Sequence, residues 1–222
     1  MNKILIVGAH PDDEILGVGG TILKHVKNGD QVKILILGDG EISRETGDIA
    51  KRQNQAQTAA MSLGVKDLIL EKLPDNQFDS VPLLTIVKIV EKAIMEFKPE
   101  IIYTHHGADL NIDHQLTFRA VITACRPQPA FFVKKILTFE TSSSTEWQSK
   151  ASEKIFLPNE YHDISEFIDK KIEILKNYQD ELRPYPHPRS AEGVKILAQY
   201  RGIEVGYRFA EAFQIIRSLN DQ

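Results

Sequence analysis

Two short segments of the chain carry residue types that bind metal ions and move protons. Residues 8–14 read GAHPDDE, and residues 104–114 read THHGADLNIDH. Each segment follows a short apolar run of the kind that forms a buried strand, and each leads into a predicted helix. In the first segment His10 and Asp13 lie three residues apart across the strand-to-helix turn, so both side chains can converge on one point. A converging imidazole and carboxylate indicate the beginning of a metal site.

The second segment can complete such a site. A catalytic metal centre uses three protein ligands and leaves a position for water, so a third ligand is expected from a neighbouring strand end. The segment offers five candidates: His105, His106, Asp109, Asp113 and His114. We favour His114 because its place at the start of a predicted helix mirrors the geometry of the first segment. Acidic residues at a helix start are often only caps, but three of the seven histidines within ten residues favour a metal site.

Alternating strands and helices are expected to bring the two segments together. Apolar runs predict buried strands at residues 4–7, 32–37, 68–70 and 101–103, and amphipathic stretches predict helices at residues 14–28, 48–63 and 81–97. A helix over residues 113–125 and a strand over residues 132–139 continue the alternation. The pattern predicts an α/β fold with a doubly wound, mostly parallel sheet of order 3-2-1-4-5 flanked by helices. In that order the first and fourth strands are neighbours where the winding reverses, and both segments line the same crevice.

The C-terminal third of the chain is less regular. Residues 163–166 resemble a capping box that opens a helix through about residue 182, and Ser190 is expected to cap a further helix that reaches Tyr200. Three prolines predict a fixed loop at residues 183–190, and residues 209–216 predict a last strand. We interpret residues 1–222 as a single domain.

Composition argues against several classes of protein. Lys and Arg number 27 against 31 Asp and Glu without any block of like charge, which disfavours nucleic acid as a partner. The single cysteine, Cys125, can make neither an internal disulfide nor a thiolate metal cage, as is typical of a reducing cytosol. No apolar run approaches the roughly 18 residues of a membrane span, and the N-terminus does not resemble a secretory signal. We expect a cytoplasmic protein without a membrane span and leave homo-oligomer formation open.

The motifs AHPDDE, at residues 9–14, and DLNIDH, at residues 109–114, resemble those of the LmbE/PIG-L family of zinc-dependent N-acetylglucosaminyl deacetylases. The likeness spans nearly the whole chain, through Arg52 and the Leu-Gly pattern that ends at Gly64, PHPRS at residues 186–190 and AEAF at residues 210–213.

This resemblance implies a Rossmann-like fold and a Zn²⁺ ion held by His10, Asp13 and His114, with Asp12 as the general base. Many members read HPDH where this chain has Asn111, and their first histidine stabilises the oxyanion or protonates the leaving group. Asn111 can donate a hydrogen bond to an oxyanion but cannot deliver a proton. The amine is then expected to receive its proton from Asp12, or from His106 or His187.

The expected reaction is metal-assisted hydrolysis of the acetamide of an amino sugar, a small-molecule substrate that the sequence does not name. Zinc would lower the pKa of water, Asp12 would take its proton, and Asn111 would stabilise the oxyanion. Glu14 and Asp113 are expected to orient the ligands or their neighbours. Side chains near the carboxyl edge of the sheet are expected to bind sugar hydroxyls, namely Asp39, Arg44, Arg52, His106 and Asp109.

Two other functions fit part of the sequence. Two histidines and one carboxylate also describe the facial triad of non-haem iron oxygenases, and Fe²⁺ would fit the same ligands of a deacetylase. The alternation of strands and helices, however, differs from the β barrels that carry those triads. The second rival is a non-catalytic sugar- or nucleotide-binding module in which Asp12 and its neighbours are only caps. Gly17, Gly19 and Gly20 lie after the motif and inside a predicted helix, so helix packing explains them better than a dinucleotide loop.

Overall fold

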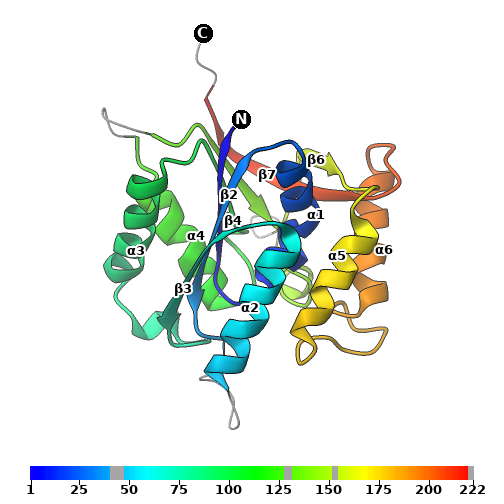
Figure 1. Cartoon of the computed structure of the whole chain (residues 1–222), viewed down its shortest axis with the longest axis horizontal. Helices are drawn as coiled ribbons and strands as arrows, with labels where there is room; N and C mark the ends of the chain where they lie inside the picture. The colour runs from blue at the N-terminus through cyan, green and yellow to red at the C-terminus, as the bar shows by residue number, and fades with distance from the viewer. Residues whose placement is uncertain (41–47, 128–131, 152–154, 220–222) are drawn as a thin grey trace.

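The described residues form a seven-stranded sheet at the centre of the molecule (Figure 1). The computed structural model describes residues 1–40, 48–127, 132–151 and 155–219. The strand order is β3-β2-β1-β4-β5-β7-β6. The bounds are β1 (Lys3–Gly8), β2 (Gln31–Gly38), β3 (Asp67–Leu73), β4 (Ile101–His105), β5 (Lys135–Phe139), β6 (Glu160–Asp163) and β7 (Ala210–Ser218).

The first five strands are parallel, and their order confirms the predicted 3-2-1-4-5 arrangement. Strand β1 pairs with β2 on one side and β4 on the other, with Ile4 opposite both Val32 and Ile101. The chain leaves β1 and β4 toward helices that lie on opposite faces of the sheet, so the winding reverses between them. This is where ligands bind in open α/β sheets.

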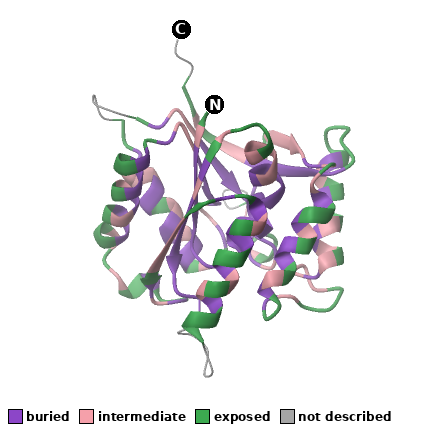
Figure 2. Cartoon of the chain, in the orientation of Figure 1, coloured by how far each residue is buried: buried purple, intermediate pink, exposed green. Residues whose placement is uncertain are grey.

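Helices cover both faces of the sheet, as Figures 1 and 2 show. Successive strand residues point to opposite faces, so Ile4 and Ile6 pack in one core cluster while Leu5 and Val7 pack in the other. The first cluster is closed by α1 (Asp13–Lys27), α2 (Ile49–Leu63), α5 (Ile168–Leu175) and α6 (Ala191–Ile203), and the second by α3 (Leu83–Phe97) and α4 (Ile112–Ala124). A strand buried on both faces reads as a continuous apolar run, which explains the sequence of β1.

The C-terminal third extends the sheet in the antiparallel sense. Strand β7 pairs with β5, and β6 pairs with β7. The predicted strand over residues 132–139 begins only at Lys135, because the facing β4 begins at Ile101, its register partner. The helix capped by Ser190 is confirmed, since the Ser190 hydroxyl accepts a hydrogen bond from Gly193 N at 2.8 Å.

The predicted capping box at residues 163–166 is wrong. Asp163 is the last residue of β6 and pairs with Ala210 of β7, and its Oδ1 accepts a hydrogen bond from Ser165 N at 2.9 Å in a tight turn. The helix therefore begins at Ile168, and it ends well before residue 182, in a single 3₁₀ turn at Lys176–Tyr178. Asp163, which the local sequence predicts as a helix cap, instead belongs to a strand because β6 pairs with β7.

Close packing of α1 explains its glycines, as predicted. A Cβ atom on Gly17 would lie 2.2 Å from the Phe139 ring, and one on Gly20 would lie 2.8 Å from Ile164. Both distances are too short for any side chain, so these positions allow α1 to approach β5 and the segment before α5.

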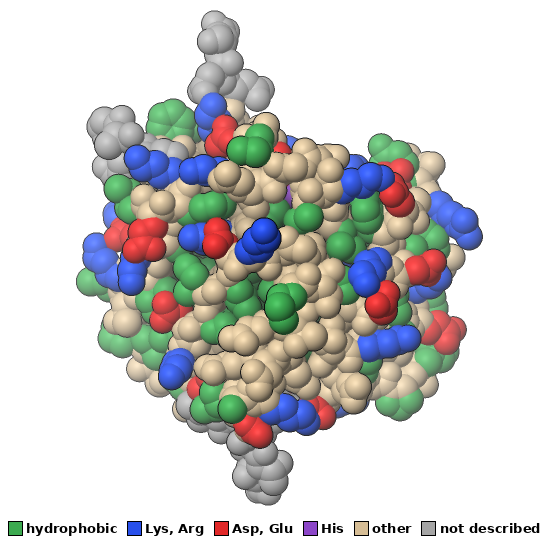
Figure 3. Space-filling model, in the orientation of Figure 1, with side chains coloured by type: hydrophobic (Ala, Val, Ile, Leu, Met, Phe, Trp, Pro, Cys, Tyr) green, Lys and Arg blue, Asp and Glu red, His purple; other side chains and the backbone are tan. Residues whose placement is uncertain are grey.

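The outer surface carries mixed charge. On the face shown in Figure 3, basic and acidic side chains lie interspersed rather than in a broad patch of one sign. Within the described residues, no helix is long and apolar enough to cross a membrane.

Candidate metal centre

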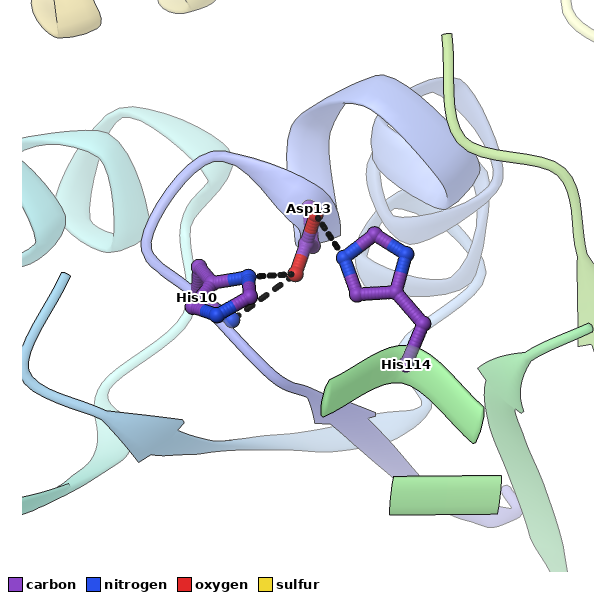
Figure 4. Close-up of side chains that lie close together, drawn as sticks. All are labelled: His10, Asp13 and His114. Carbon is purple, nitrogen blue, oxygen red and sulfur yellow. Dashed lines mark hydrogen bonds and ion pairs between the residues drawn. The ribbon is translucent and has the colours of Figure 1, made fainter. Parts of the chain in front are cut away.

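His10, Asp13 and His114 meet beyond the adjacent ends of β1 and β4 (Figure 4). His10 lies in the turn after β1, Asp13 begins α1, and His114 lies in the first turn of α4. His10 Nδ1 is 3.5 Å from Asp13 Oδ2, and His114 Nε2 is 3.5 Å from Asp13 Oδ1. All three residues are buried. The cluster joins the two segments that the sequence singled out.

Two facing atoms of this cluster lack hydrogen-bond partners within the described part of the chain. They are Asp13 Oδ1 and His114 Nε2, both buried. Buried polar atoms are nearly always hydrogen-bonded, because leaving one unpaired costs about 1–3 kcal/mol. A cation bound between them would satisfy both atoms, and two imidazoles with one carboxylate form a donor set that suits Zn²⁺. The residues therefore fit a divalent metal ion.

The charges around the cluster also suit a cation. Burial alone would raise the pKa of Asp13, but His114, His105 and His10 hold it well below the usual value, so this carboxyl is ionised. Burial opposes charge on His10, yet its contacts with Asp113 and Asp13 raise its pKa to about 10. A protonated His10 thus compensates the carboxylates in the absence of a metal, and metal binding must displace that proton.

Two further carboxylates orient the two histidines of the cluster. Asp113 accepts a hydrogen bond from His10 Nε2 at 2.9 Å and another from Phe78 N at 2.9 Å. Asp109 Oδ1 faces His114 Nδ1 at 3.1 Å. These contacts fix each ring so that His10 Nδ1 and His114 Nε2 point at Asp13, as in metal sites whose histidines are held by carboxylates. Asp75 Oδ1 also lies 3.3 Å from His10 Nε2.

His105 supports the centre from the sheet side. Its ring stacks on that of His114 at 3.9 Å between centroids. Its Nε2 accepts a hydrogen bond from Ala9 N at 3.0 Å, so the ring proton is assigned to Nδ1, beside Thr141 Oγ1. Burial, with His114 nearby, lowers the pKa of His105 to about 4. This neutral ring packs on His114, with its Nε2 3.2 Å from Asp13 Oδ2, and so lies behind the cluster of His10, Asp13 and His114.

Asp12 is at the N-cap position of α1, but its side chain does not cap the helix. It precedes α1 with a φ of 117°, a conformation that residues other than glycine seldom adopt, and its side chain makes no capping hydrogen bond. The carboxylate instead accepts a hydrogen bond from Arg189 Nη1 at 2.9 Å. Burial raises the pKa of Asp12 to about 6, although Arg189 opposes the shift. The backbone strain is consistent with a functional position.

A polar cavity of about 200 Å³ lies over the cluster. It is lined by His10, Asp12, Gly40, Arg52, Asp75, Asn76, Asn111, Glu181 and Arg189. Across it runs a chain of ion pairs, in which Arg52 Nη2 donates to Glu181 at 2.6 Å and Arg189 contacts both Glu181 and Asp12. A larger hollow of about 700 Å³ lies between α2 and β3, but its lining, among the described residues, includes no histidine or carboxylate. The smaller cavity is therefore the candidate active site.

Several predicted site residues take their places around this cavity. Asn111 lines it and caps α4, with Oδ1 accepting from Asp113 N at 2.8 Å and Nδ2 donating to Asn76 at 3.0 Å. Arg52 lines it as well. Glu14 is buried behind Asp12, where it accepts hydrogen bonds from Tyr178 Oη at 2.6 Å and Asp12 N at 3.0 Å.

Other predicted contacts lie outside the cavity wall. Asp109 is fully buried and accepts a hydrogen bond from Thr145 Oγ1 at 2.5 Å while it holds His114. Asp39 is buried after β2, and the buried His106 packs its ring on Phe156 at 5.4 Å. The predicted residue Arg44 lies outside the described residues.

His187 contacts Arg189, a residue of the cavity wall. Its ring meets Trp147 edge to face at 5.4 Å, and its Nδ1 accepts a hydrogen bond from Arg189 N at 3.1 Å. It is not among the described residues that line the cavity.

Three charged residues of the cavity wall were not identified from the sequence. Arg189 belongs to the PHPRS segment, whose expected site residue was His187, but the Arg189 side chain is the one that reaches Asp12. The other two residues lie in segments without a motif. Glu181 follows the 3₁₀ turn after α5, and Asp75 follows β3. The sequence around an acidic loop residue does not indicate which distant arginine or histidine will pair with it.

Comparisons with known proteins place this geometry in context. The family model described as PIG-L, GlcNAc-PI de-N-acetylase, matches residues 5–125. The chain is 29% identical over 182 residues to the "Uncharacterized deacetylase YaiS" of Escherichia coli, covering 79% of this chain and 90% of the relative. It is 26% identical over 193 residues to the "Probable N-acetyl-alpha-D-glucosaminyl L-malate deacetylase 2" of Bacillus anthracis, covering 80% of each. The solved N,N'-diacetylchitobiose deacetylase from Pyrococcus horikoshii has the same fold, with a TM-score of 0.78, 21% identity and coverage of 97% of this chain and 84% of that one.

Proposed function

The chain belongs to the PIG-L family, and from this membership and its site we propose that it removes the acetyl group from an N-acetylated amino sugar or its conjugate. One observation carries the proposal: a buried His, Asp and His cluster that fits a metal ion adjoins a cavity whose wall includes a strained aspartate. The relatives named as N-acetylglucosaminyl L-malate and diacetylchitobiose deacetylases support an N-acetylglucosamine type of substrate.

His10, Asp13 and His114 are the proposed ligands of a divalent ion, with Zn²⁺ as the first choice. Such an ion would supply a Lewis acid that acidifies water and polarises an amide carbonyl. Asp113 and Asp109 hold the two histidine rings in place. Asp109 was expected to bind sugar, but its burial beneath His114 favours this orienting role.

Asp12 is the proposed general base. A pKa of about 6 leaves its carboxylate ionised at neutral pH and still basic enough to accept a proton from water. Arg189 donates a hydrogen bond to Asp12 Oδ2 and so holds the carboxylate on the cavity wall. Once protonated, Asp12 can return the proton to the departing amine, which removes the need for a histidine at position 111.

Asn111 is the proposed donor to the oxyanion. Its Nδ2 carries two hydrogens, one of which donates to Asn76 Oδ1. Because Oδ1 is fixed by Asp113 N, the amide is preorganised, as electrostatic stabilisation of a transition state requires. Arg52 lines the same cavity and is the proposed contact for sugar hydroxyls, while Asp39 and His106 remain candidates beside it.

His187 is proposed to act through Arg189. Its imidazole accepts the Arg189 N–H and thereby fixes the segment whose guanidinium holds Asp12. Removing the ring should lower turnover without removing the metal.

The test is a panel of N-acetylated amino sugars incubated with the zinc-loaded protein, with release of primary amine and acetate measured together. The panel includes N-acetylglucosamine, its malate glycoside and N,N'-diacetylchitobiose. Equal amounts of amine and acetate are expected from at least one sugar. The matched control is the zinc-loaded Asp12→Asn variant. Release of neither amine nor acetate from any sugar of the panel, with one metal bound per chain, would overturn the proposal.

Metal analysis separates this function from its rivals. A binding module with caps at residues 12–14 should purify without stoichiometric metal, whereas a deacetylase should bind about one ion per chain through its three ligands. An iron-dependent oxygenase should consume O₂ in the presence of its substrate. Amine release without O₂ consumption is the expected result, whichever divalent metal fills the site.

A further inference from the structure

The loop after β5 displays an exposed aromatic ring beside the candidate active site. It contains a 3₁₀ turn at Thr145–Trp147, and Trp147 at its end is 53% exposed. Trp147 is the only tryptophan of the chain. Large aromatic side chains lose much contact energy when they face water, so an exposed one that is rigidly held is a candidate for ligand contact.

The turn that carries Trp147 is anchored to the metal centre. Before Trp147 in the chain, Thr145 Oγ1 donates a hydrogen bond to Asp109 Oδ2 at 2.5 Å. After it, Gln148 Nε2 donates to the main-chain oxygen of Asp109 at 2.9 Å. Asp109 in turn faces the ligand His114. The residues on either side of Trp147 are therefore both bonded to Asp109, one to its carboxylate and one to its main-chain oxygen, which holds this turn in place before any ligand arrives.

The other side of the indole contacts the loop that holds the proposed base. The rings of Trp147 and His187 meet edge to face, with centroids 5.4 Å apart and an angle of 88°. His187 Nδ1 accepts from Arg189 N, and Arg189 donates to Asp12. The aromatic pair thus bridges the two loops that position His114 and Asp12, next to the segment whose Arg189 lines the cavity.

The cavity itself differs in chemistry from this rim. Its lining is polar, its arginines are paired with carboxylates, and its volume of about 200 Å³ is on the scale of one sugar ring. A group attached to that ring must leave the cavity across its rim. A pyranose presents an apolar face of C–H groups that packs well on an aromatic ring, and a tryptophan offers such a surface with little loss of side-chain entropy.

We propose that Trp147, backed by His187, forms a second sugar subsite that stacks against the pyranose joined to the N-acetylated sugar in the cavity. The inference rests on the proposed deacetylase function and names its substrate class as a disaccharide or longer glycan rather than a free monosaccharide. No step of the hydrolysis requires Trp147, so the subsite governs binding and not the chemistry.

The single tryptophan makes the subsite directly observable. The zinc-loaded Asp12→Asn variant is titrated with N,N'-diacetylchitobiose and, separately, with N-acetylglucosamine, while tryptophan emission is recorded and binding is followed by calorimetry. The disaccharide should bind with a saturable change in emission, and the monosaccharide should bind more weakly without one. Disaccharide binding that leaves the emission unchanged, or an equal response to both sugars, would overturn the subsite.

Kinetics of the active protein supply the second measurement. Trp147→Ala should raise KM for the disaccharide roughly tenfold, which corresponds to about 1.4 kcal/mol of stacking, with kcat nearly unchanged. Trp147→Phe should restore part of the loss, and KM for the monosaccharide should not move. The matched control is Tyr207→Ala, which removes an exposed aromatic ring beyond the far end of α6 and should change neither constant.

Failure of the subsite and failure of the proposed function are distinguishable. Deacetylation of the disaccharide with the same KM in wild type and Trp147→Ala would reject the subsite alone. A disaccharide-specific change in emission, with no amine released by the wild type, would keep the subsite and reject the deacetylase function.

Discussion

At the scale of single residues, two adjacent aspartates have different environments. Asp13 faces three histidines, which hold its pKa low, as suits the proposed metal ligand. Asp12 turns into the cavity, where burial raises its pKa to about 6 and Arg189 pairs with it. One residue of sequence separates a proposed ligand from a proposed base because the backbone reverses at the positive φ of Asp12.

Replacing Asp12 by Asn tests the role of the base. Asn tolerates a positive φ, so the turn should survive, but its amide cannot accept the proton from water. Turnover should fall by roughly 10²–10⁴-fold, the usual contribution of a positioned general base. Activity assays and metal analysis are made on the same preparation. A near-normal rate at full metal occupancy would place the base elsewhere, and loss of metal would mean that Asp12 is a ligand.

Replacing any of the three proposed ligands by Ala should remove the metal. His10, Asp13 and His114 offer one donor each, so the loss of one leaves too few protein ligands for tight binding. Metal content is measured by mass spectrometry after dialysis. The matched control is His25→Ala, which removes a histidine bonded to Tyr103 and Asp30 in the last turn of α1. Unchanged metal in all three ligand variants would contradict the assignment.

At the scale of elements, a buried ion pair holds α1, the helix whose first turn carries the site. Glu211 of β7 accepts hydrogen bonds from Gly20 N at 2.8 Å, Thr21 N at 2.7 Å and Lys171 Nζ at 2.7 Å. Lys171 Nζ also donates to Leu16 O at 2.9 Å. A side chain that inserts among the main-chain groups of a helix can fix its course. The pair thus joins α1, α5 and β7.

Breaking this pair should destabilise the protein strongly. Glu211→Ala leaves the buried ammonium of Lys171 unpaired, and removing one partner of a buried pair costs about 3–5 kcal/mol. The free energy of unfolding is measured by urea titration. The control is Asp169→Ala at the exposed pair with Lys195, which should change little because solvent screens that contact. Equal effects of the two substitutions would show that the buried pair does not stabilise α1.

At the scale of the whole molecule, a bound metal should stabilise the fold. Its proposed ligands come from two segments far apart in the sequence, one after β1 and one after β4. A ligand that binds only the folded state adds about 2.7 kcal/mol at a free concentration of one hundred times Kd. Zinc should therefore raise the melting temperature of the wild type, measured by calorimetry. His114→Ala should show no rise, and an equal rise in that variant would indicate binding elsewhere.

Cys125 should report global unfolding. It lies in the core beside α4 with 3% exposure, and burial raises the pKa of its thiol to about 12. The thiolate is the reactive form, so a thiol reagent at pH 8 should label the native protein slowly and the unfolded protein at once. Labelling is followed by mass spectrometry in increasing urea. Rapid labelling without denaturant would show that this part of the core opens locally.

Much of the fold and of the site follows from local sequence. Apolar runs of three to eight residues between amphipathic stretches predict buried strands and covering helices because each pattern matches one backbone period. The handedness of crossovers then leaves few sheet orders, and 3-2-1-4-5 places the segments after β1 and β4 together. The cluster of His10, Asp13 and His114 could be predicted because each residue lies at a strand end or helix start that the sequence marks.

The remaining features depend on contacts that no local pattern encodes. Arg189 reaches Asp12 across 177 positions, and Asp109 is buried against His114, with the hydroxyls of Ser144 and Thr145 donating to its carboxylate. Asp163 belongs to a strand because β7 returns beside it. The burial, the pKa and the ion-pair partner of each of these side chains depend on the packed chain. Distant segments come close only when helices cover both faces of the sheet. Local sequence thus predicted most of the elements and the proposed metal ligands, whereas tertiary packing fixed β6 and the side chains that surround the cluster, because those contacts join distant segments.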